Sequence, residues 1–239
     1  MKYERILLKI SGEVLSGKSP IDFDNVTAAA EHIKALHDNG CKLGVVVGGG
    51  NIWRGRSSGS MERNRADNIG MLATACNSLA LEQALVDLGV PVRVLSAVSM
   101  ETFMDSYSAR EANRSIDEGT VVIFACGTGS PFFTTDTAAA LRAAQIHADA
   151  MLLAKNVDGI YTADPTKDPT AKRYARIGYD EVIARDLKAT DITAICFARE
   201  NHLPLLLFAM RSSENFVAAA NGINVGTVVD DKPGFEYAE

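Results

Sequence analysis

Three consecutive glycines, Gly48 to Gly50, are the residues that point most clearly to chemistry. Each glycine costs backbone entropy and adds no side chain to a core, so packing alone does not explain the run. Because the β-branched segment Val45 to Val47 comes directly before, we expect the glycines at the carboxyl end of a buried strand, where open α/β sheets bind ligands. Their N–H groups could surround an anion, and phosphate is the usual occupant.

Cationic side chains lie close to such glycine turns. Lys9 stands near the end of a predicted strand, Arg5 to Ile10, just before Ser11 and Gly12, and we interpret it as a phosphate ligand and not as an edge lysine. Arg54 follows the three glycines and could hold the same anion with its bidentate guanidinium. A solvated basic loop explains the other arginines of this segment equally well, namely Arg56, Arg63 and Arg65.

The stretch Gly12 to Ser19 matches the P-loop pattern G-x-x-x-x-G-K-[ST], and it follows a strand. A P-loop also needs a helix that opens at its lysine, and Pro20 pushes Ser19 out of the helical region. We therefore interpret Gly17 to Ser19 as a surface turn. The next helix is expected to run to about Asn39, with Asp24 or Asn25 as its N-cap.

A second buried strand, Thr120 to Cys126, also feeds a glycine and hydroxyl-rich loop, Gly127 to Asp136. A helix from Asp136 to His147 should follow, with Thr135 or Asp136 as its N-cap. The two phenylalanines of this loop either belong to the core or stack on a flat ring. This loop is therefore a second candidate anion site on the same sheet edge.

Asp67 is expected in the first turn of a long helix, Ala66 to Leu88. There its negative charge either interacts favourably with the helix dipole or recognises ligand hydroxyls. After a further strand, Ala150 to Ala154, a turn-rich loop carries Lys155 and Tyr161, which suit phosphate and an aromatic base.

Strands and helices alternate along the chain, which predicts an α/β fold with a mostly parallel sheet. Other strands are expected at Val90 to Leu95 and Leu205 to Phe208, and Val225 to Val229 should end the sheet. The span from Arg176 to Glu200 is expected to be mostly helical.

The chain has 239 residues and a net charge of −6, so it has no general attraction for nucleic acid and a local cluster must hold any anionic ligand. Neither a signal peptide nor an apolar run of membrane length is expected, and these features favour the cytoplasm. The histidines show no metal spacing, and no metal site is predicted. Reduced core thiols are expected for the cysteines, which are Cys41, Cys76, Cys126 and Cys196.

Five segments together carry a family resemblance. They are KISGE at 9–13, VVVGGGNIWRG at 45–55, ADNIGMLAT at 66–74, TGSPFFTTD at 128–136 and KNVDGIYTADP at 155–165. In this order the chain resembles the amino-acid-kinase superfamily, and most closely its UMP-phosphorylating branch. The resemblance implies a three-layer αβα sandwich formed by one domain, residues 1–239. About 1–150 would bind the acceptor, and about 151–239 would bind ATP.

The resemblance also implies roles for individual residues. ATP would be bound by Lys9, Ile10, Ser11, Gly12, Gly50, Arg54, Lys155, Tyr161 and Asp164. UMP would be bound by Gly49, Asp67, Thr128, Gly129, Ser130, Pro131, Phe132, Phe133, Thr134 and Thr135. Arg93 falls where the family has an effector-site arginine. Members are typically homohexamers, activated by GTP and inhibited by UTP, and Mg²⁺ would accompany ATP.

A phosphate oxygen is already an anion, so the implied reaction needs no catalytic base. We predict that Lys9 stabilises the transferred phosphoryl, with Arg54 as a further catalytic cation. Asp191 either orients Lys9 or is only a helix N-cap. Two alternatives stay open: a kinase for small carboxylates, and a nucleotide-binding storage or sensor protein on the same fold.

Overall fold

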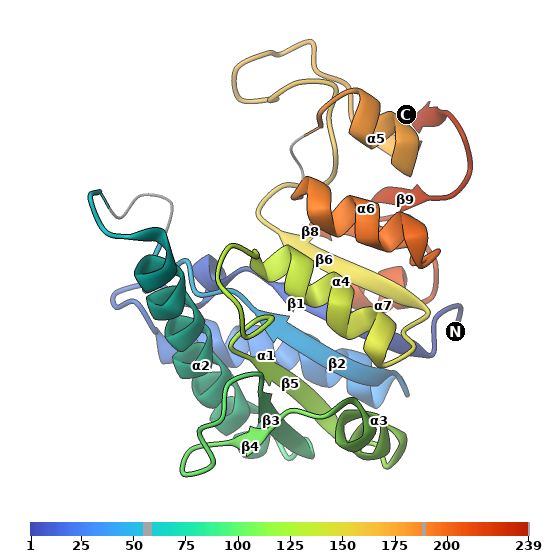
Figure 1. Cartoon of the computed structure of the whole chain (residues 1–239). Helices are drawn as coiled ribbons and strands as arrows, with labels where there is room; N and C mark the ends of the chain where they lie inside the picture. Colours follow the sequence, from blue (N-terminus) through green and yellow to red (C-terminus); the bar gives the residue numbers. More distant parts are fainter. Residues whose placement is uncertain (55–58, 188–189, 239) are drawn as a thin grey trace.

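The computed structural model describes residues 1–54, 59–187 and 190–238. Its centre is a ten-stranded sheet in the order β10-β7-β9-β8-β6-β1-β2-β5-β3-β4 (Figure 1). Neighbouring strands are parallel except in the β8–β9 and β7–β10 pairs, so the prediction of a mostly parallel sheet is confirmed. The strands are β1 (Arg5–Ile10), β2 (Lys42–Val47), β3 (Val92–Ser96), β4 (Asp105–Ser106), β5 (Val121–Ala125), β6 (Ala150–Lys155), β7 (Tyr174–Gly178), β8 (Leu205–Ala209), β9 (Gly226–Asp230) and β10 (Phe235–Tyr237).

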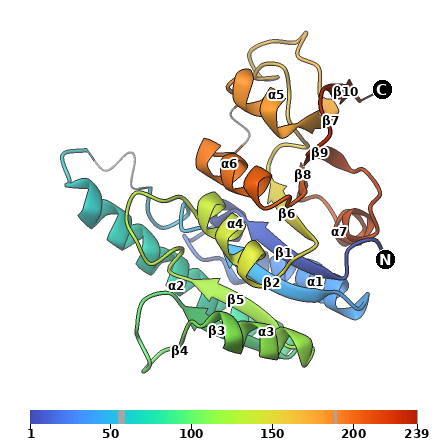
Figure 2. The same ribbon diagram turned by 45° about the vertical axis from the view of Figure 1, so that its right-hand side comes forward.

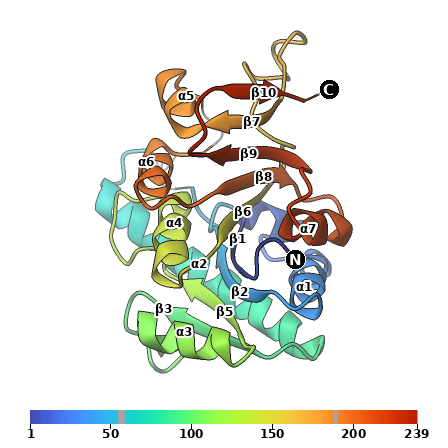
Figure 3. The ribbon, with the colours of Figure 1, turned by 90° about the vertical axis from the view of Figure 1, so that its right-hand side faces the viewer.

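Helices cover both faces of this sheet, which makes three layers (Figures 2 and 3). One face carries α1 (Phe23–Asp38), α2 (Arg63–Asp87) and α7 (Ser213–Ala220), and α1 packs against both of the others. The opposite face carries α3 (Ala109–Asp117), α4 (Thr135–Gln145), α5 (Tyr179–Ala184) and α6 (Ile192–Glu200). A short 3₁₀ turn, η1 (Gly12–Leu15), follows β1.

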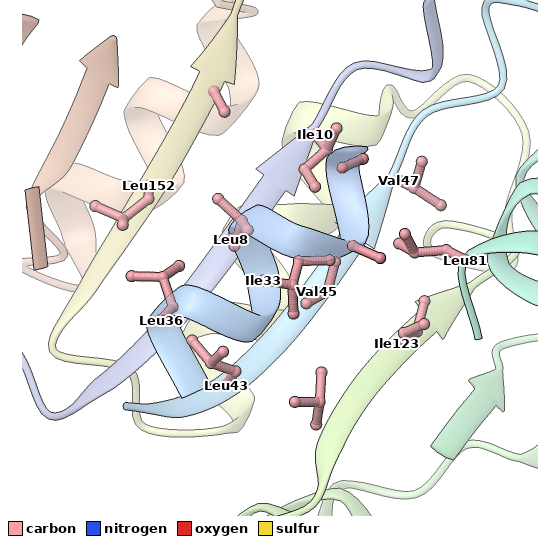
Figure 4. Packing of buried hydrophobic residues seen from close by; sticks show 14 of the residues in the cluster. Leu8, Ile10, Ile33, Leu36, Leu43, Val45, Val47, Leu81, Ile123 and Leu152 are labelled. Carbon is pink, nitrogen blue, oxygen red and sulfur yellow. The ribbon is translucent and has the colours of Figure 1, made fainter. Parts of the chain in front are cut away.

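The core forms because side chains alternate along each strand between the two faces. On β1, Leu8 and Ile10 pack toward α1, whereas Leu7 belongs to the cluster on the other face. Figure 4 shows the first cluster, in which Ile33 and Leu36 of α1 lie over the strands. All five side chains are fully buried, and each such burial stabilises the fold by about 1.5–3 kcal/mol.

Two helices begin earlier than the sequence indicates. The N-cap of α1 is Asp22, whose side chain accepts a hydrogen bond from the Asp24 amide, so the prediction of Asp24 or Asn25 is wrong. The N-cap of α4 is Thr134, which accepts from the Thr137 amide. Neither Thr135 nor Asp136 is therefore the cap.

Three further differences concern elements near the site or the end of the sheet. Helix α2 begins at Arg63 and not at Ala66, which places Asp67 beyond the first turn. The span predicted as mostly helical opens with strand β7. The strand Gly226–Asp230 does not end the sheet, because it lies between β8 and β7, and β10 forms the edge.

Helix α2 differs from two expectations, one about apolar runs of membrane length and one about buried cysteines. It is long and apolar enough to cross a membrane, the one such helix in the described ranges, so the expectation that no run reaches that length is wrong. Length and composition are weak criteria, and here α2 packs against α1, β3 and β5 as a core helix does. Its outer face exposes Cys76, so not every cysteine is a core thiol, although all four are free.

Candidate functional site

The carboxyl ends of β1, β2, β5 and β6 lie at one edge of the sheet because these strands run parallel. Strand β1 sits between β2 and β6, and Lys9 is in register with Val46 on one side and Leu153 on the other. The connection through α1 covers one face and the connection through α4 covers the other, so β1 and β6 flank a topological switch point. Open α/β sheets bind their ligands at such points.

A buried cluster of two lysines and one carboxylate lies at this point. The Nζ of Lys9 is 2.9 Å from Oδ1 of Asp136, and the Nζ of Lys155 is 3.1 Å from Oδ2 of the same residue. Thr190 donates a further hydrogen bond of 2.7 Å to that Oδ2. The three charged side chains are 11–17% exposed. The cluster therefore carries one surplus positive charge that water screens poorly.

The protonation states follow from this geometry. Burial alone would raise the pKa of Asp136, but the charges of Lys9 and Lys155 outweigh it and hold that pKa well below its ordinary value. Burial lowers the pKa of Lys155, and the negative charge of Asp136 opposes that shift. Asp136 also lies in the first turn of α4, where the helix dipole favours a carboxylate. Asp136 is therefore an anion at neutral pH.

Asp191 does not pair with Lys9, so the prediction that it orients this lysine is wrong. Its side chain caps α6 by accepting a 2.8 Å hydrogen bond from the Ala194 amide, which is the alternative function considered above. It also accepts hydrogen bonds from the Thr134 and Thr137 hydroxyls of α4. Asp191 thus ties the start of α6 to the start of α4.

The glycine loop differs in part from the expected anion cradle. The Gly48 amide already donates to the Ile10 carbonyl, and the Gly48 carbonyl accepts from the buried side chain of Asn77. A Cβ on Gly49 would stand 2.8 Å from the Gly70 carbonyl oxygen of α2, so close packing does require this glycine. Within the described residues, the Gly49 and Gly50 amides have no acceptor. The candidate cradle is therefore reduced to these two N–H groups.

A cleft of about 510 Å³ opens beside this loop. Four segments form it: η1, the glycine loop with the residues that follow it, the first half of α2 and the loop after β5. Seven predicted acceptor residues and two predicted donor residues line it. The lining is Glu13, Gly49, Gly50, Trp53, Arg54, Arg63, Ala66, Asp67, Gly70, Met71, Thr74, Gly127, Thr128, Ser130, Phe133, Thr134 and Thr135.

Asp67 joins two walls of this cleft. Its Oδ2 accepts a 2.6 Å hydrogen bond from Arg63 Nε and a 2.8 Å hydrogen bond from the Phe132 amide. The Phe132 ring lies under the Arg63 guanidinium, 5.2 Å from its carbon. Phe132 and Phe133 are 61% and 53% exposed, which excludes the core alternative for this pair. Of the predicted acceptor residues, Gly129, Pro131 and Phe132 do not line the cleft.

The arginines of the basic segment have separate positions. Arg54 lines the cleft and pairs with Glu13 of η1. Arg63 belongs to α2, and Arg65 is 81% exposed and lies 3.6 Å from a carboxylate oxygen of Glu62. Arg56 falls outside the described residues.

A second cavity, of about 520 Å³, is formed by the loop that follows β6 and by residues after α5. Tyr161 and Asp164, both predicted donor residues, line it. The Tyr161 hydroxyl donates a 2.8 Å hydrogen bond to Asp158 Oδ1. Asp136 directly follows Thr135 of the first cleft, and Lys155, at the end of β6, lies two residues before Val157 of the second cavity, so the segments that carry the charged cluster lead into both cavities.

The remaining predicted residues have structural partners. Ser11 precedes η1, and a Cβ on Gly12 would stand 2.2 Å from the Gly48 carbonyl oxygen, so the tips of β1 and β2 touch there. Arg93 donates to Asp105 and pairs with Glu111, which ties β3 to β4 and α3. In the ranges that the structure covers, no three His, Cys, Asp or Glu side chains are grouped to hold a metal ion.

Sequence reasoning missed the central carboxylate. The sequence indicates Asp136 only as a candidate cap, although its place at the end of a threonine loop and in the first helical turn at the sheet edge is a usable signal. Thr190 and Asn77 gave no signal, because an isolated hydroxyl or amide has no distinctive spacing.

Two cavities lined by loops that follow β2, β5 and β6, with a buried cluster of two lysines at the tips of β1 and β6, are typical of an α/β phosphotransferase. The chain belongs to the amino acid kinase family, whose model matches residues 4–209. It is 49% identical over 232 residues to the uridylate kinase of Bacteroides thetaiotaomicron, covering 95% of this chain and 98% of that protein.

Solved structures agree with this assignment. The UMP kinase of Bacillus anthracis is similar with a TM-score of 0.96 at 32% identity, over 100% of both chains. The UMP kinase of Ureaplasma parvum is similar with a TM-score of 0.90 at 39% identity, over 97% of this chain and 100% of that one. The predicted family and the three-layer α/β fold are therefore confirmed.

Proposed function

We propose that this chain is a UMP kinase, which transfers the γ-phosphoryl group of ATP to UMP. The names of its relatives support this activity, and so does one geometric observation. Asp136 and Lys155 of the Lys9–Asp136–Lys155 cluster stand on the segments that lead into the first and the second cavity, and we infer that a phosphoryl group passing from one cavity to the other would pass two ammonium groups.

UMP is proposed to bind in the first cleft. Asp67 is the acceptor for the ribose hydroxyls, because its carboxylate lines the cleft and is held in place by two donors. The hydroxyl and amide groups of the Thr128 to Thr135 loop bind uracil and phosphate, and Phe133 offers an exposed ring beside them. The Gly49 amide contributes one more donor to the phosphate.

ATP is proposed to extend from the cluster into the second cavity. Its phosphates are bound by cations and amides of the first half of the chain, and its base and ribose by the second half, about residues 151–239. Phosphate contacts are assigned to Lys9, Ile10, Ser11, Gly12, Gly50 and Arg54. The rest of the nucleotide is assigned to Lys155, Tyr161 and Asp164, of which Tyr161 and Asp164 line the second cavity.

Mg²⁺ is proposed to arrive with ATP, held mainly by phosphate oxygens and water as is usual for this ion. The donor set fits that arrangement. The described residues contain no group of three potential ligands, and Asp136 is already paired with two lysines. Bound in this way, Mg²⁺ neutralises part of the charge on the phosphates.

The transfer itself needs positioning and charge stabilisation. A UMP phosphate oxygen attacks the γ-phosphorus of ATP in line, and the bond to the β-phosphate oxygen breaks. Because the nucleophile is already ionised, no side chain has to remove a proton. Lys9, held by Asp136, stabilises the equatorial oxygens of the transferred group, with Arg54 and the Gly50 amide beside it. Loss of such a preorganised donor costs roughly 10²–10³ in kcat.

Regulation and assembly are proposed from the family resemblance. The enzyme is a cytoplasmic homohexamer, activated by GTP and inhibited by UTP, and it binds neither nucleic acid nor membrane. Arg93 belongs to the effector site, and an effector phosphate would have to compete with Asp105 and Glu111 for its guanidinium.

The test is ADP release from ATP and Mg²⁺ with a panel of acceptors: UMP, CMP, acetylglutamate and carbamate. We expect turnover with UMP. Turnover with a carboxylate alone would contradict the proposal, and so would tight ATP binding without turnover on any acceptor. Lys9→Ala should lose about 10²–10³ in kcat, and near-normal turnover of this variant would refute the role of Lys9.

A further inference from the structure

The chain leaves β5 through two successive residues in the left-handed region. Cys126 has a φ of 61° and Gly127 a φ of 58°. Glycine adopts this conformation without strain, whereas a cysteine does so at a cost and needs support from its surroundings. Two side chains supply that support. Thr74 Oγ1 accepts a 2.9 Å hydrogen bond from the Cys126 amide, and Arg142 Nη2 donates a 3.1 Å hydrogen bond to the Gly127 carbonyl.

Holding this turn with Arg142 costs folding free energy, because the guanidinium is buried. Arg142 is 4% exposed, on the inward face of α4, and its guanidinium lies 3.8 Å from the centre of the Tyr107 ring. Its Nη1 donates to the side chain of Gln145. Within the described residues its Nε has no partner and no carboxylate forms an ion pair with it. A buried cation without a counter-ion destabilises a fold relative to an apolar side chain of similar size.

The position of this cation beside the first cleft explains why the cost in stability is tolerated. Gly127, whose carbonyl Arg142 holds, lines the first cleft together with Thr128 and Thr74, while Arg142 itself lies behind the wall. Its charge therefore acts on the cleft through a poorly screened interior, and an anion bound there is its counter-charge. Strain and unpaired charge are tolerated where they prepare a binding site.

Resting on the proposed function, we propose that Arg142 is a positioning residue for the acceptor. It fixes the turn after β5 in the conformation that places the Thr128 to Thr135 loop against UMP, and its charge favours the UMP phosphate. It touches neither the transferred phosphoryl nor the second cavity. Substitution of Arg142 should therefore weaken the binding of UMP and leave the binding of ATP unchanged.

The experiment measures KM for UMP and for ATP separately, with Kd for UMP by calorimetry, in the full-length enzyme. Arg142→Met keeps the volume and removes both the donor and the charge. We expect the UMP KM and Kd to rise at least tenfold, with the ATP KM within twofold of the wild type and kcat at saturating UMP within about threefold. Arg142→Lys keeps the charge and should recover part of the UMP affinity.

Ile146→Val is the matched control, since Ile146 is the fully buried C-cap of the same helix, at the end opposite to the Thr128 to Thr135 loop. It should lower Tm without changing either KM. An unchanged UMP KM in both Arg142 variants would overturn the inference, and so would an equal rise in the two KM values. A wild-type protein that releases no ADP with UMP would instead refute the proposed function, and this inference with it.

Discussion

Asp136→Asn tests the cluster most directly, because it removes one charge and changes almost no volume. In the native chain this carboxylate faces two ammonium groups, at 2.9 Å from Lys9 and 3.1 Å from Lys155. An amide in its place would leave two buried cations side by side. Each has lost its counter-ion, and each repels the other.

The magnitude follows from these distances. At an effective dielectric constant of 20, one such ion pair is worth about 5 kcal/mol of Coulomb energy, and the desolvation of the charges offsets part of it. Breaking a buried pair by removal of one partner usually destabilises a protein by about 3–5 kcal/mol. We expect Asp136→Asn to fall in that range when the free energy of unfolding is measured by urea titration. Turnover should fall roughly 10²–10³-fold, because Lys9 is no longer held.

The stabilisation that Asp136 provides should depend on pH in a definite direction. The pKa of Asp136 is depressed by folding, so its contribution to stability is present above the unfolded pKa of about 4 and is lost as pH falls toward the folded value. The difference in stability between wild type and variant should therefore be full at pH 6–8 and shrink below about pH 4. Removing the Asp136 charge also lowers the pKa of Lys155 further, so the variant should lose activity at a lower pH than the wild type as pH rises.

Asp168→Asn is the control, since Asp168 is a carboxylate on an exposed turn outside both cavities. It should change stability by no more than about 0.5 kcal/mol and leave kcat unaltered. The reasoning would be refuted by an Asp136→Asn enzyme with native stability and turnover. A destabilised variant with native kcat would refute only the catalytic part.

Four further substitutions test the walls of the two cavities. Asp67→Asn should raise the UMP KM about tenfold with little change in the ATP KM, measured by steady-state kinetics. Gly49→Ala should lower the free energy of unfolding by about 1–3 kcal/mol, because its Cβ would press on the Gly70 carbonyl at 2.8 Å. Gly50→Ala, with its nearest neighbour at 3.6 Å, should unfold like the wild type and still lose activity. Tyr161→Ala should raise the ATP KM and spare the UMP KM.

The parts of the fold that sequence predicted well are those with strong local patterns. Strands β1 and β2 are mainly apolar runs followed by glycine turns, so the sequence locates both correctly. Strand β7 was missed because Tyr174–Gly178 mixes polar and apolar residues and directly adjoins α5. Its state is set by pairing with β9 and β10, which come more than fifty residues later in the chain.

The site shows the same division. The loops were found because glycine and threonine runs at strand ends are distinctive. The partner of Lys9 was assigned to Asp191 because both Asp136 and Asp191 read as helix caps, and spacing along the chain cannot distinguish them. Only the packing of α4 and α6 decides, since Asp191 faces the hydroxyls of α4 while Asp136 faces the lysines.

The charges inside this protein oppose its overall charge. The chain as a whole carries −6, yet the carboxyl edge of its sheet holds two lysines on one carboxylate, and Arg142, which has no ion-pair partner among the described residues, lies behind the neighbouring wall. Apolar residues in these places would pack at a lower cost in free energy. A surplus of buried positive charge is therefore best explained by a ligand that compensates it. Two polyanions, one in each cavity, would do so, and the acidic exterior would then limit non-specific binding of other anions.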